Sequence, residues 1–176
     1  TPHLTAYSTA NAARDMDILR AALGEKKLNY MGKSYGTFMG ALYAYLFPDK
    51  IGRVVLDGAV DPTVSNIDQT KNQAVSFDNA LNAFIKDCAR KSNCPLPKDQ
   101  KAAIDTLLNL WSSAATNPLK LKNTKDDRTV SESLLVIGTA SALYDSEEGW
   151  PQLRQALREA LTGYGDTYLE LADNYT

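Results

Sequence analysis

The sequence predicts an α/β fold class, in which a short parallel sheet with a helix between its strands is followed by a mainly helical module. Two short apolar runs, residues 28–33 and 54–56, are typical of buried strands, and a helix-like segment lies between them. A strand, a crossover helix and a second strand make the βαβ unit of parallel sheets. From residue 66 onwards apolar residues recur every three or four positions, which indicates helices. We therefore expect a partial α/β core over 1–62 and a helical domain over 63–176.

The first predicted helix covers residues 9–23. Ala12, Met16, Leu19 and Leu23 follow one another at spacings of four, three and four, so they form one apolar stripe along a helix. Gly24 follows as a C-terminal glycine does, which predicts the end of the helix at this point.

The second predicted helix covers residues 35–47 and is rich in small side chains. Its glycines and alanines suit a helix that packs closely on a sheet, and Pro48 stops it because the proline ring cannot continue the hydrogen-bond ladder. The strand that follows runs into turns at Asp57-Gly58 and Asp61-Pro62. Parallel strands are buried on both faces, so two strands need neighbours. The helical remainder does not supply them, and we expect the sequence to be a fragment of a longer protein.

The second half is predicted to be helical, with one exception. The helical segments are 73–91, 98–116, 129–145 and 149–175, and prolines at 95, 97, 118 and 151 break the pattern. Residues 119–130 are the one stretch predicted to be extended, as a small hairpin in a connecting loop.

Composition and charge exclude two classes of partner. The chain has 176 residues, is 44% apolar and 23% charged, and carries a formal net charge of −2, so it offers no basic stripe for the phosphates of a nucleic acid. No run of about 18 apolar residues predicts a membrane span. The N-terminal residues lack the features of a signal peptide, so export cannot be read from this end. No metal or organic cofactor is implied.

The two cysteines, Cys88 and Cys94, are separated by five residues. This spacing does not fit a zinc knuckle, and the single histidine cannot complete a four-ligand set. A short disulfide is favoured over two free thiols, and it would pin a helix end and indicate an oxidising compartment.

Residues 30–38, "YMGKSYGTF", carry the strongest functional pattern. Ser34 lies between Gly32 and Gly36 at the predicted junction of a strand and a helix. In a nucleophile elbow the serine takes a strained positive φ, and its neighbours two positions away must be small because the strand and helix backbones nearly touch. The N–H of Tyr35 would then hold a developing oxyanion at the helix N-terminus. We favour a nucleophile at Ser34 over a structural glycine-serine turn.

A serine nucleophile needs a base, and the sequence offers a poor candidate. His3 is the only histidine, and it precedes the elbow, whereas the expected chain order is serine, then acid, then histidine. We therefore interpret His3 as a surface residue. Asp57 and Asp61 follow the second strand, a place from which some enzymes with this elbow draw the acid, but turn chemistry explains them better. The chain then has a nucleophile and no general base, so the base lies elsewhere in a longer enzyme or in another chain.

Residues 7–62 resemble a known family at these positions. The segments "ARDMDILRAALG", "GKSYGT" and "LFPDKIGRVVLDGAVDP" are similar to the tripeptidyl-aminopeptidase-like branch of the α/β-hydrolases, secreted bacterial serine peptidases related to the prolyl aminopeptidases. The helical remainder resembles the lid of that family more loosely, through the cysteine pair, "WPQLRQAL" and "LELADNY". The resemblance implies a partial α/β-hydrolase core with the nucleophile elbow, followed by a helical lid.

The resemblance also implies roles for particular residues. Ser34 is the nucleophile and the Tyr35 N–H is one oxyanion donor. A second donor would precede residue 1, and the triad acid and histidine would follow residue 176, so the chain's partners are the remaining N- and C-terminal parts of the hydrolase domain. The resemblance and the cysteine pair together imply a secreted or cell-envelope location in a bacterium.

Such enzymes release short peptides from free N-termini, so the expected partner is a peptide with a free ammonium group. Asp145, Glu147 and Glu148, beside Tyr144 and Trp150, are candidates to bind that group. The favoured alternative is that these acids merely stabilise a helix N-terminus.

Three functions follow from this reading. The first is a serine exopeptidase that acts through Ser34, with the isolated chain inactive; the alternatives are an esterase or lipase of the same fold, and a non-catalytic lid-bearing fragment or binding module.

Overall fold

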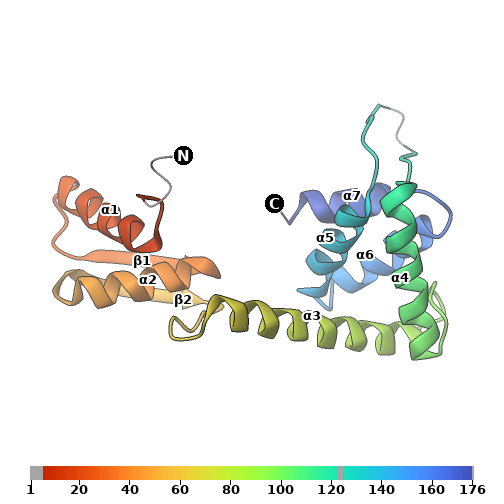
Figure 1. Cartoon of the computed structure of the whole chain (residues 1–176), viewed down its shortest axis with the longest axis horizontal. Coiled ribbons are helices and arrows are strands. Elements are labelled where there is room, and N and C mark those ends of the chain that lie inside the picture. Colours follow the sequence, from red (N-terminus) through yellow and green to blue (C-terminus); the bar gives the residue numbers. More distant parts are fainter. Residues whose placement is uncertain (1–5, 123–124, 176) are drawn as a thin grey trace. The chain divides into compact units, whose positions relative to one another are not determined.

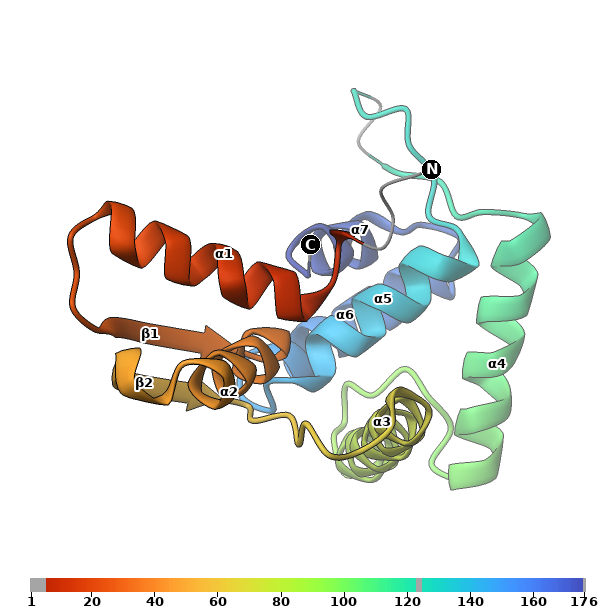
Figure 2. The ribbon, with the colours of Figure 1, turned by 60° about the vertical axis from the view of Figure 1, so that its left-hand side comes forward.

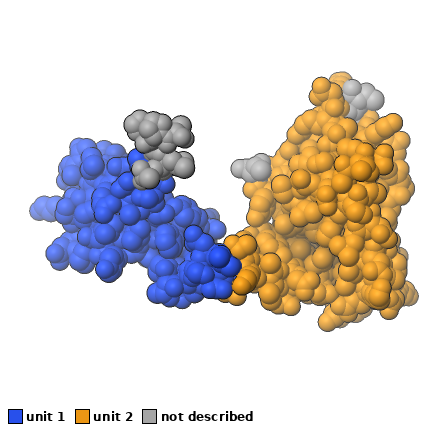
Figure 3. All heavy atoms as spheres, in the orientation of Figure 1, with its two compact units in different colours: residues 1–69 blue, residues 70–176 orange. Residues whose placement is uncertain are grey.

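The computed structural model describes residues 6–122 and 125–175. The chain divides into two compact units, Thr1–Gln69 and Thr70–Thr176, coloured separately in Figure 3. The division falls within helix α3 (Asn66–Ala89), and each unit is described by itself. The sequence-based boundary after residue 62 precedes this helix and stays a proposal.

Unit 1 is built around a parallel strand pair. Its elements are α1 (Thr9–Ala22), β1 (Leu28–Lys33), α2 (Tyr35–Leu46), a short 3₁₀ turn (Pro48–Lys50) and β2 (Ile51–Asp57), shown in Figure 1. Within the described residues β1 and β2 form a two-stranded sheet, with Leu28 opposite Ile51 and Lys33 opposite Asp57. The βαβ unit predicted from the sequence is therefore confirmed.

Helix α2 packs closely on both strands because its glycines leave room for their side chains. A Cβ at Gly40 would lie 2.6 Å from Cε1 of Tyr30 on β1 and 2.9 Å from Cδ2 of Leu56 on β2. The small residues in this helix thus serve the close packing that their pattern predicts.

Helix α1 begins and ends as predicted, but its apolar stripe is buried only in part, at Ala12 and Met16. Gly24 has a φ of 73° just beyond the helix, as a C-terminal glycine does. Leu19 and Leu23 are 60% and 70% exposed, whereas Ala13 is fully buried. The spacing of the stripe predicted the helix correctly, and it does not identify the face that packs.

Polar side chains join α1 to α2 instead. The Asp17 carboxylate accepts hydrogen bonds from Arg20 (2.8 Å), from the Tyr43 hydroxyl of α2 (3.0 Å) and from Lys50 (2.9 Å). We refer to these four residues as the Asp17 cluster.

The prediction that the two strands are buried is wrong, because β1 and β2 are largely exposed among the described residues. Met31 and Val55 are 63% and 57% exposed, and β2 is exposed along most of its length. The reason is that a parallel sheet buries its strands only between further strands and helices on both faces. The two strands described here have α2 on them and no third strand beside them.

Unit 2 is a helical module, as predicted. It contains the C-terminal part of α3, then α4 (Gln100–Thr116), α5 (Glu132–Leu143), α6 (Gly149–Ala160) and α7 (Asp166–Asp173). Helices α5, α6 and α7 pack side by side, as Figure 2 shows. The fully buried side chains of unit 2 include Phe84 of α3, Leu107 of α4, and Leu135, Leu153, Leu157 and Tyr168 of α5 to α7. Across residues 6–122 and 125–175, no helix has both the length and the apolar character needed to cross a bilayer.

Two details of the helical half differ from the sequence pattern. The segment 149–175 is two helices, because the chain turns at Gly163, whose φ is 90°. Pro151 does not break α6; it lies in the first turn, where the N–H that proline lacks has no intrahelical partner.

The connections in unit 2 are fixed by isolated β-bridges and a disulfide. Leu119 and Val130 exchange two backbone hydrogen bonds of 2.9 Å as an antiparallel bridge, and Lys120 forms a parallel bridge with Tyr164. As far as the described residues go, the predicted extended stretch therefore pairs with itself at Leu119 and Val130 alone. A disulfide joins Cys88 in the last turn of α3 to Cys94 in the following loop, and so ties down the end of the helix.

Candidate active site

Ser34 forms the entire connection between β1 and α2. Its φ is 50° and its ψ is −119°, and it is the one non-glycine residue with a positive φ among those described. The positive φ predicted for the tip of an elbow is therefore present. Such a conformation costs about 1–3 kcal/mol, so the surrounding structure must hold it in place.

The glycine before Ser34 is required by a contact between backbones. A Cβ built on Gly32 would lie 2.5 Å from the carbonyl oxygen of Gly36 and 2.6 Å from its carbonyl carbon. A Cβ on Gly36 would meet only the Tyr30 hydroxyl, at 3.3 Å. The end of β1 and the start of α2 thus touch, and the demand for a small residue is strict at Gly32 and weaker at Gly36.

Hydrogen bonds from β1, from the end of β2 and from the loop after β2 hold the elbow. The Ser34 N–H donates to the Asp57 carbonyl at the end of β2 (3.0 Å). The Tyr30 hydroxyl donates to the Gly36 carbonyl (2.7 Å). The Val60 N–H donates to the Thr37 hydroxyl (2.9 Å), which itself donates to the Ser34 carbonyl (2.6 Å).

Sequence reasoning did not single out Tyr30 or Thr37. Both lie in the stretch that identifies the elbow, and their polar character in a strand and a helix that pack together was the available signal. The direction of their hydroxyls depends on the tertiary structure, so their partners could not be read from the pattern.

The elbow presents a hydroxyl beside the first backbone N–H of a helix. Ser34 is exposed, and in the described ranges its hydroxyl caps no N–H of α2. Tyr35 is the first residue of α2, so its N–H has no carbonyl one turn earlier to bond with. The N-terminus of a helix carries a partial positive charge. This arrangement is suited to hold an oxygen that becomes negative when Ser34 attacks a carbonyl carbon.

The described residues bring no general base to Ser34. His3, the only histidine of the sequence, lies outside them. The Asp61 carboxylate accepts hydrogen bonds from the Thr63 hydroxyl (2.7 Å) and N–H (2.8 Å), which lower the pKa of Asp61. Asp61 thus closes a turn, as its Asp-Pro sequence suggests.

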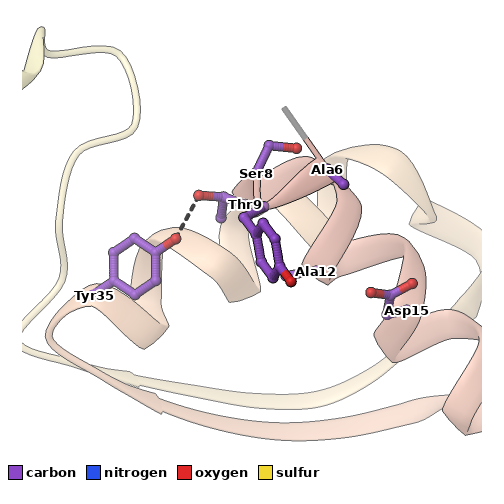
Figure 4. Close-up of a pocket in the computed structure, with 7 residues that line it drawn as sticks. Ala6, Ser8, Thr9, Ala12, Asp15 and Tyr35 are labelled. Atoms are coloured by element: carbon purple, nitrogen blue, oxygen red, sulfur yellow. Dashed lines mark hydrogen bonds between the residues drawn. The ribbon is translucent and has the colours of Figure 1, made fainter. Parts of the chain in front are cut away.

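The side chain of Tyr35 points away from the elbow towards the start of α1. Its hydroxyl is 2.5 Å from the hydroxyl of Thr9, and the two residues line one side of a shallow hollow of about 290 Å³ (Figure 4). The hollow is further lined by Ala6, Tyr7, Ser8, Ala12 and Asp15. The contact links the residue after Ser34 to the N-terminus of α1.

The acidic residues singled out in the sequence lie in unit 2, at the start of α6. Oδ1 of Asp145 accepts hydrogen bonds from the N–H groups of Glu147 (2.7 Å) and Glu148 (3.1 Å). These bonds support the alternative in which the cluster organises a helix start. Ser34 belongs to unit 1, so the structure does not bring the two groups together in one body.

The two aromatic residues beside these acids have different surroundings. Trp150 packs edge-on against Phe84 of the core, with ring centres 5.9 Å apart. Tyr144 is exposed and contacts Phe77 and Tyr175. A hydrogen bond with Tyr175 raises the pKa of the Tyr144 hydroxyl, and burial raises it further by a smaller amount.

Comparison with known proteins gives relatives over almost the whole chain. Serine protease Hip1 of Mycobacterium tuberculosis is 41% identical over 176 residues, which cover 98% of this chain and 34% of that protein. Tripeptidyl aminopeptidase of Streptomyces lividans is 43% identical over 121 residues, or 67% of this chain and 22% of that protein. Carboxylesterase B of Mycobacterium tuberculosis is 39% identical over 174 residues, or 98% of this chain and 32% of that protein.

These relatives share the fold family that the elbow indicates. Hip1 and carboxylesterase B match almost all of this chain, but the chain spans only about a third of the length of each of them. The sequence pattern of the alpha/beta hydrolase fold matches residues 1–172. The chain therefore belongs to the α/β-hydrolase family.

Proposed function

We propose that this chain carries the nucleophile of a serine peptidase, with Ser34 as that nucleophile. The observation that carries the proposal is the backbone of Ser34, which has a positive φ directly before the first N–H of a helix. Strained backbone conformations of this kind cluster at active sites. The relatives named serine protease and tripeptidyl aminopeptidase support the same reaction class.

The geometry supports acyl transfer. A general base takes the proton of the Ser34 hydroxyl as Oγ attacks the carbonyl carbon of the substrate, and it later delivers this proton to the leaving amine. The N–H of Tyr35 donates a hydrogen bond to the oxygen that becomes negative. The intermediate collapses, the amine leaves with a proton, and water then hydrolyses the acyl-enzyme. A histidine base and its acid are supplied by the remaining parts of the hydrolase domain, so the isolated chain is inactive.

The peptide end that this enzyme recognises is a free N-terminus. The name of the Streptomyces lividans relative and the exposed carboxylates of Glu147 and Glu148 support this assignment. Because Asp145 already binds two backbone N–H groups, Glu147 and Glu148 are the better candidates of the three for the ammonium group.

An esterase is the second candidate. The relative named carboxylesterase B matches 98% of this chain, and a serine elbow serves ester and amide substrates alike.

The disulfide supports a location in an oxidising compartment. Disulfides persist in secreted and envelope proteins and are rare in the cytosol. We propose that the Cys88–Cys94 bond reflects secretion or attachment to the cell envelope of a bacterium.

Kinetics with three substrates test the proposal on the full-length gene product. A tripeptide amide with a free N-terminus should be hydrolysed at least about tenfold faster, in kcat/KM, than the same peptide acetylated at its N-terminus, since a salt bridge in a dry pocket contributes on this scale. Ser34→Ala should remove this activity, and Ser112→Ala, at an exposed serine of α4, should keep it.

Each outcome discriminates among the candidates. Hydrolysis of the short acyl ester without cleavage of either peptide would replace the peptidase with the esterase. Activity retained by Ser34→Ala would reject the nucleophile, and turnover by the isolated 176-residue chain would show that a base exists within it.

A further inference from the structure

Thr37 occupies an unusual place in the first turn of α2. It is 1% exposed, and its hydroxyl is used twice: it donates to the Ser34 carbonyl (2.6 Å) and accepts from the Val60 N–H (2.9 Å). Val60 is 23 residues away, in the loop that follows β2. One hydroxyl thus connects the elbow to the loop at the end of the neighbouring strand.

Within the described part of the chain, the Ser34 carbonyl accepts two hydrogen bonds, and both come from Thr37. The Thr37 N–H donates to it at 2.9 Å, in addition to the hydroxyl. A carbonyl oxygen has two lone pairs, so its acceptor capacity is filled. The helix start needs only the backbone bond, and the hydroxyl therefore adds a restraint beyond what the helix requires.

That restraint acts on the oxyanion donor through the peptide plane. The Ser34 carbonyl and the Tyr35 N–H belong to one peptide unit, which is planar and trans, so the N–H points opposite to the C=O. Fixing the carbonyl from one side fixes the direction of the N–H on the other. On the preceding side, the Ser34 N–H is held by the Asp57 carbonyl at 3.0 Å.

We propose that Thr37 is a positioning residue that aims the Tyr35 N–H at the oxyanion, an inference that rests on the function proposed above. The Thr37 hydroxyl does not touch the substrate. It holds the peptide plane whose N–H stabilises negative charge in the transition state, and Val60 holds the hydroxyl in turn. An interaction realised only in the transition state affects kcat and leaves KM unchanged.

Two substitutions separate the hydroxyl from the shape of the side chain. Thr37→Val removes the hydroxyl and keeps the volume, whereas Thr37→Ser keeps the hydroxyl and removes the methyl group. Thr139→Val is the matched control, because Thr139 is also a buried helical threonine whose hydroxyl donates to a backbone carbonyl, that of Leu135 (2.8 Å) in unit 2. Thr37→Ala replaces Thr37→Val in the comparison should the valine variant not fold.

The full-length gene product is assayed with a peptide amide and with a peptide aldehyde, which forms a tetrahedral adduct with a serine. Thr37→Val should lower kcat about tenfold or more, leave KM within about twofold, and weaken aldehyde binding by a factor similar to the loss in kcat. Thr37→Ser should restore kcat and aldehyde affinity to within about threefold of wild type, and Thr139→Val should match wild type.

Wild-type kcat and aldehyde affinity in Thr37→Val would overturn the inference. Equal losses in Thr37→Val and Thr37→Ser would also overturn it, because activity would then be lost even where the hydroxyl is kept, and the effect would follow from any change in packing at this position. Ser34→Ala in the same assay separates the two proposals. If it retains activity, the proposed function fails, and if it is inactive while Thr37→Val is unimpaired, only the role of Thr37 fails.

Discussion

Among single residues, Gly32 marks the position at which the elbow excludes a side chain most strictly. Its missing Cβ leaves space for the backbone of Gly36, which cannot move away without displacing the start of α2. Ser34 holds its strained φ only while β1 and α2 stay this close, so Gly32 links backbone packing to the position of the hydroxyl.

Replacing the two glycines should therefore have unequal effects. Gly32→Ala should destabilise the full-length gene product by about 2 kcal/mol or more and abolish hydrolysis, because the new methyl group overlaps backbone atoms. Gly36→Ala should cost less than about 1 kcal/mol, since only the Tyr30 hydroxyl lies near and it can shift slightly. Denaturant unfolding and kcat/KM measure both effects, and equal losses for the two variants would contradict the geometry described here.

The residues of the site were predictable where the backbone imposes a rule and unpredictable where tertiary contacts decide. Gly32, Ser34 and Gly36 follow from the demands of a strand-turn-helix junction. Tyr30 and Thr37 do not, because a hydroxyl in a pattern can face solvent or a backbone group and only the fold selects between them. The acidic cluster before α6 is ambiguous for a similar reason, since carboxylates suit both a helix start and an ammonium group.

At the level of elements, α1 is attached to α2 through the Asp17 cluster. Hydrogen bonds from Arg20 and then Lys50 hold the pKa of Asp17 well below its usual range. Burial and the bond to Asp17 raise the pKa of the Tyr43 hydroxyl. Arg20 also donates to the Glu25 carbonyl beyond the end of α1. The attachment is ionic, so it depends on pH.

The stability of unit 1 should fall in acid through Asp17. A carboxyl group with a lowered folded-state pKa stabilises the protein above its unfolded-state pKa of about 3.9, and this contribution is lost as the pH falls towards the folded-state value. In the full-length gene product, Asp17→Asn should be less stable than wild type at pH 7, and the difference should shrink as the pH falls below about 4. Denaturant unfolding of both proteins between pH 7 and pH 2 measures this. A difference that stays constant over the whole range would exclude the role of the Asp17 charge.

The positions of the elements along the chain were predicted well, and the faces through which they pack were predicted poorly. Spacing identified the ends of α1, β1 and α2 to within one residue, and it placed β2 correctly but began it three residues late, because periodicity and glycine or proline signals are local. The packed face of α1 was not identified, since it is joined to α2 by charged groups that an apolar stripe does not reveal.

For the whole molecule, the exposed strands and the elbow without a base have one common interpretation. The chain covers about a third of the curated relatives that it matches along its whole length, and the apolar side chains of β1 and β2 are those that a larger parallel sheet buries. We propose that the remaining parts of the hydrolase domain cover these strands and supply the acid and the histidine. The sequence could indicate that strands and a base are missing, because it contains two apolar strands and one histidine, which precedes Ser34. It could not show which residues of the remaining domain fill these places.

The central claim is that Ser34 is a nucleophile aimed at an acyl carbon, and labelling with a fluorophosphonate tests it most directly. The full-length gene product is treated with the probe, digested, and the modified peptide is identified by mass spectrometry, with Ser34→Ala and Ser112→Ala treated alongside. The account predicts one modified residue, Ser34, with labelling lost in Ser34→Ala and kept in Ser112→Ala. An active full-length protein whose Ser34 stays unmodified, or a Ser34→Ala variant that is still labelled and active, would contradict it.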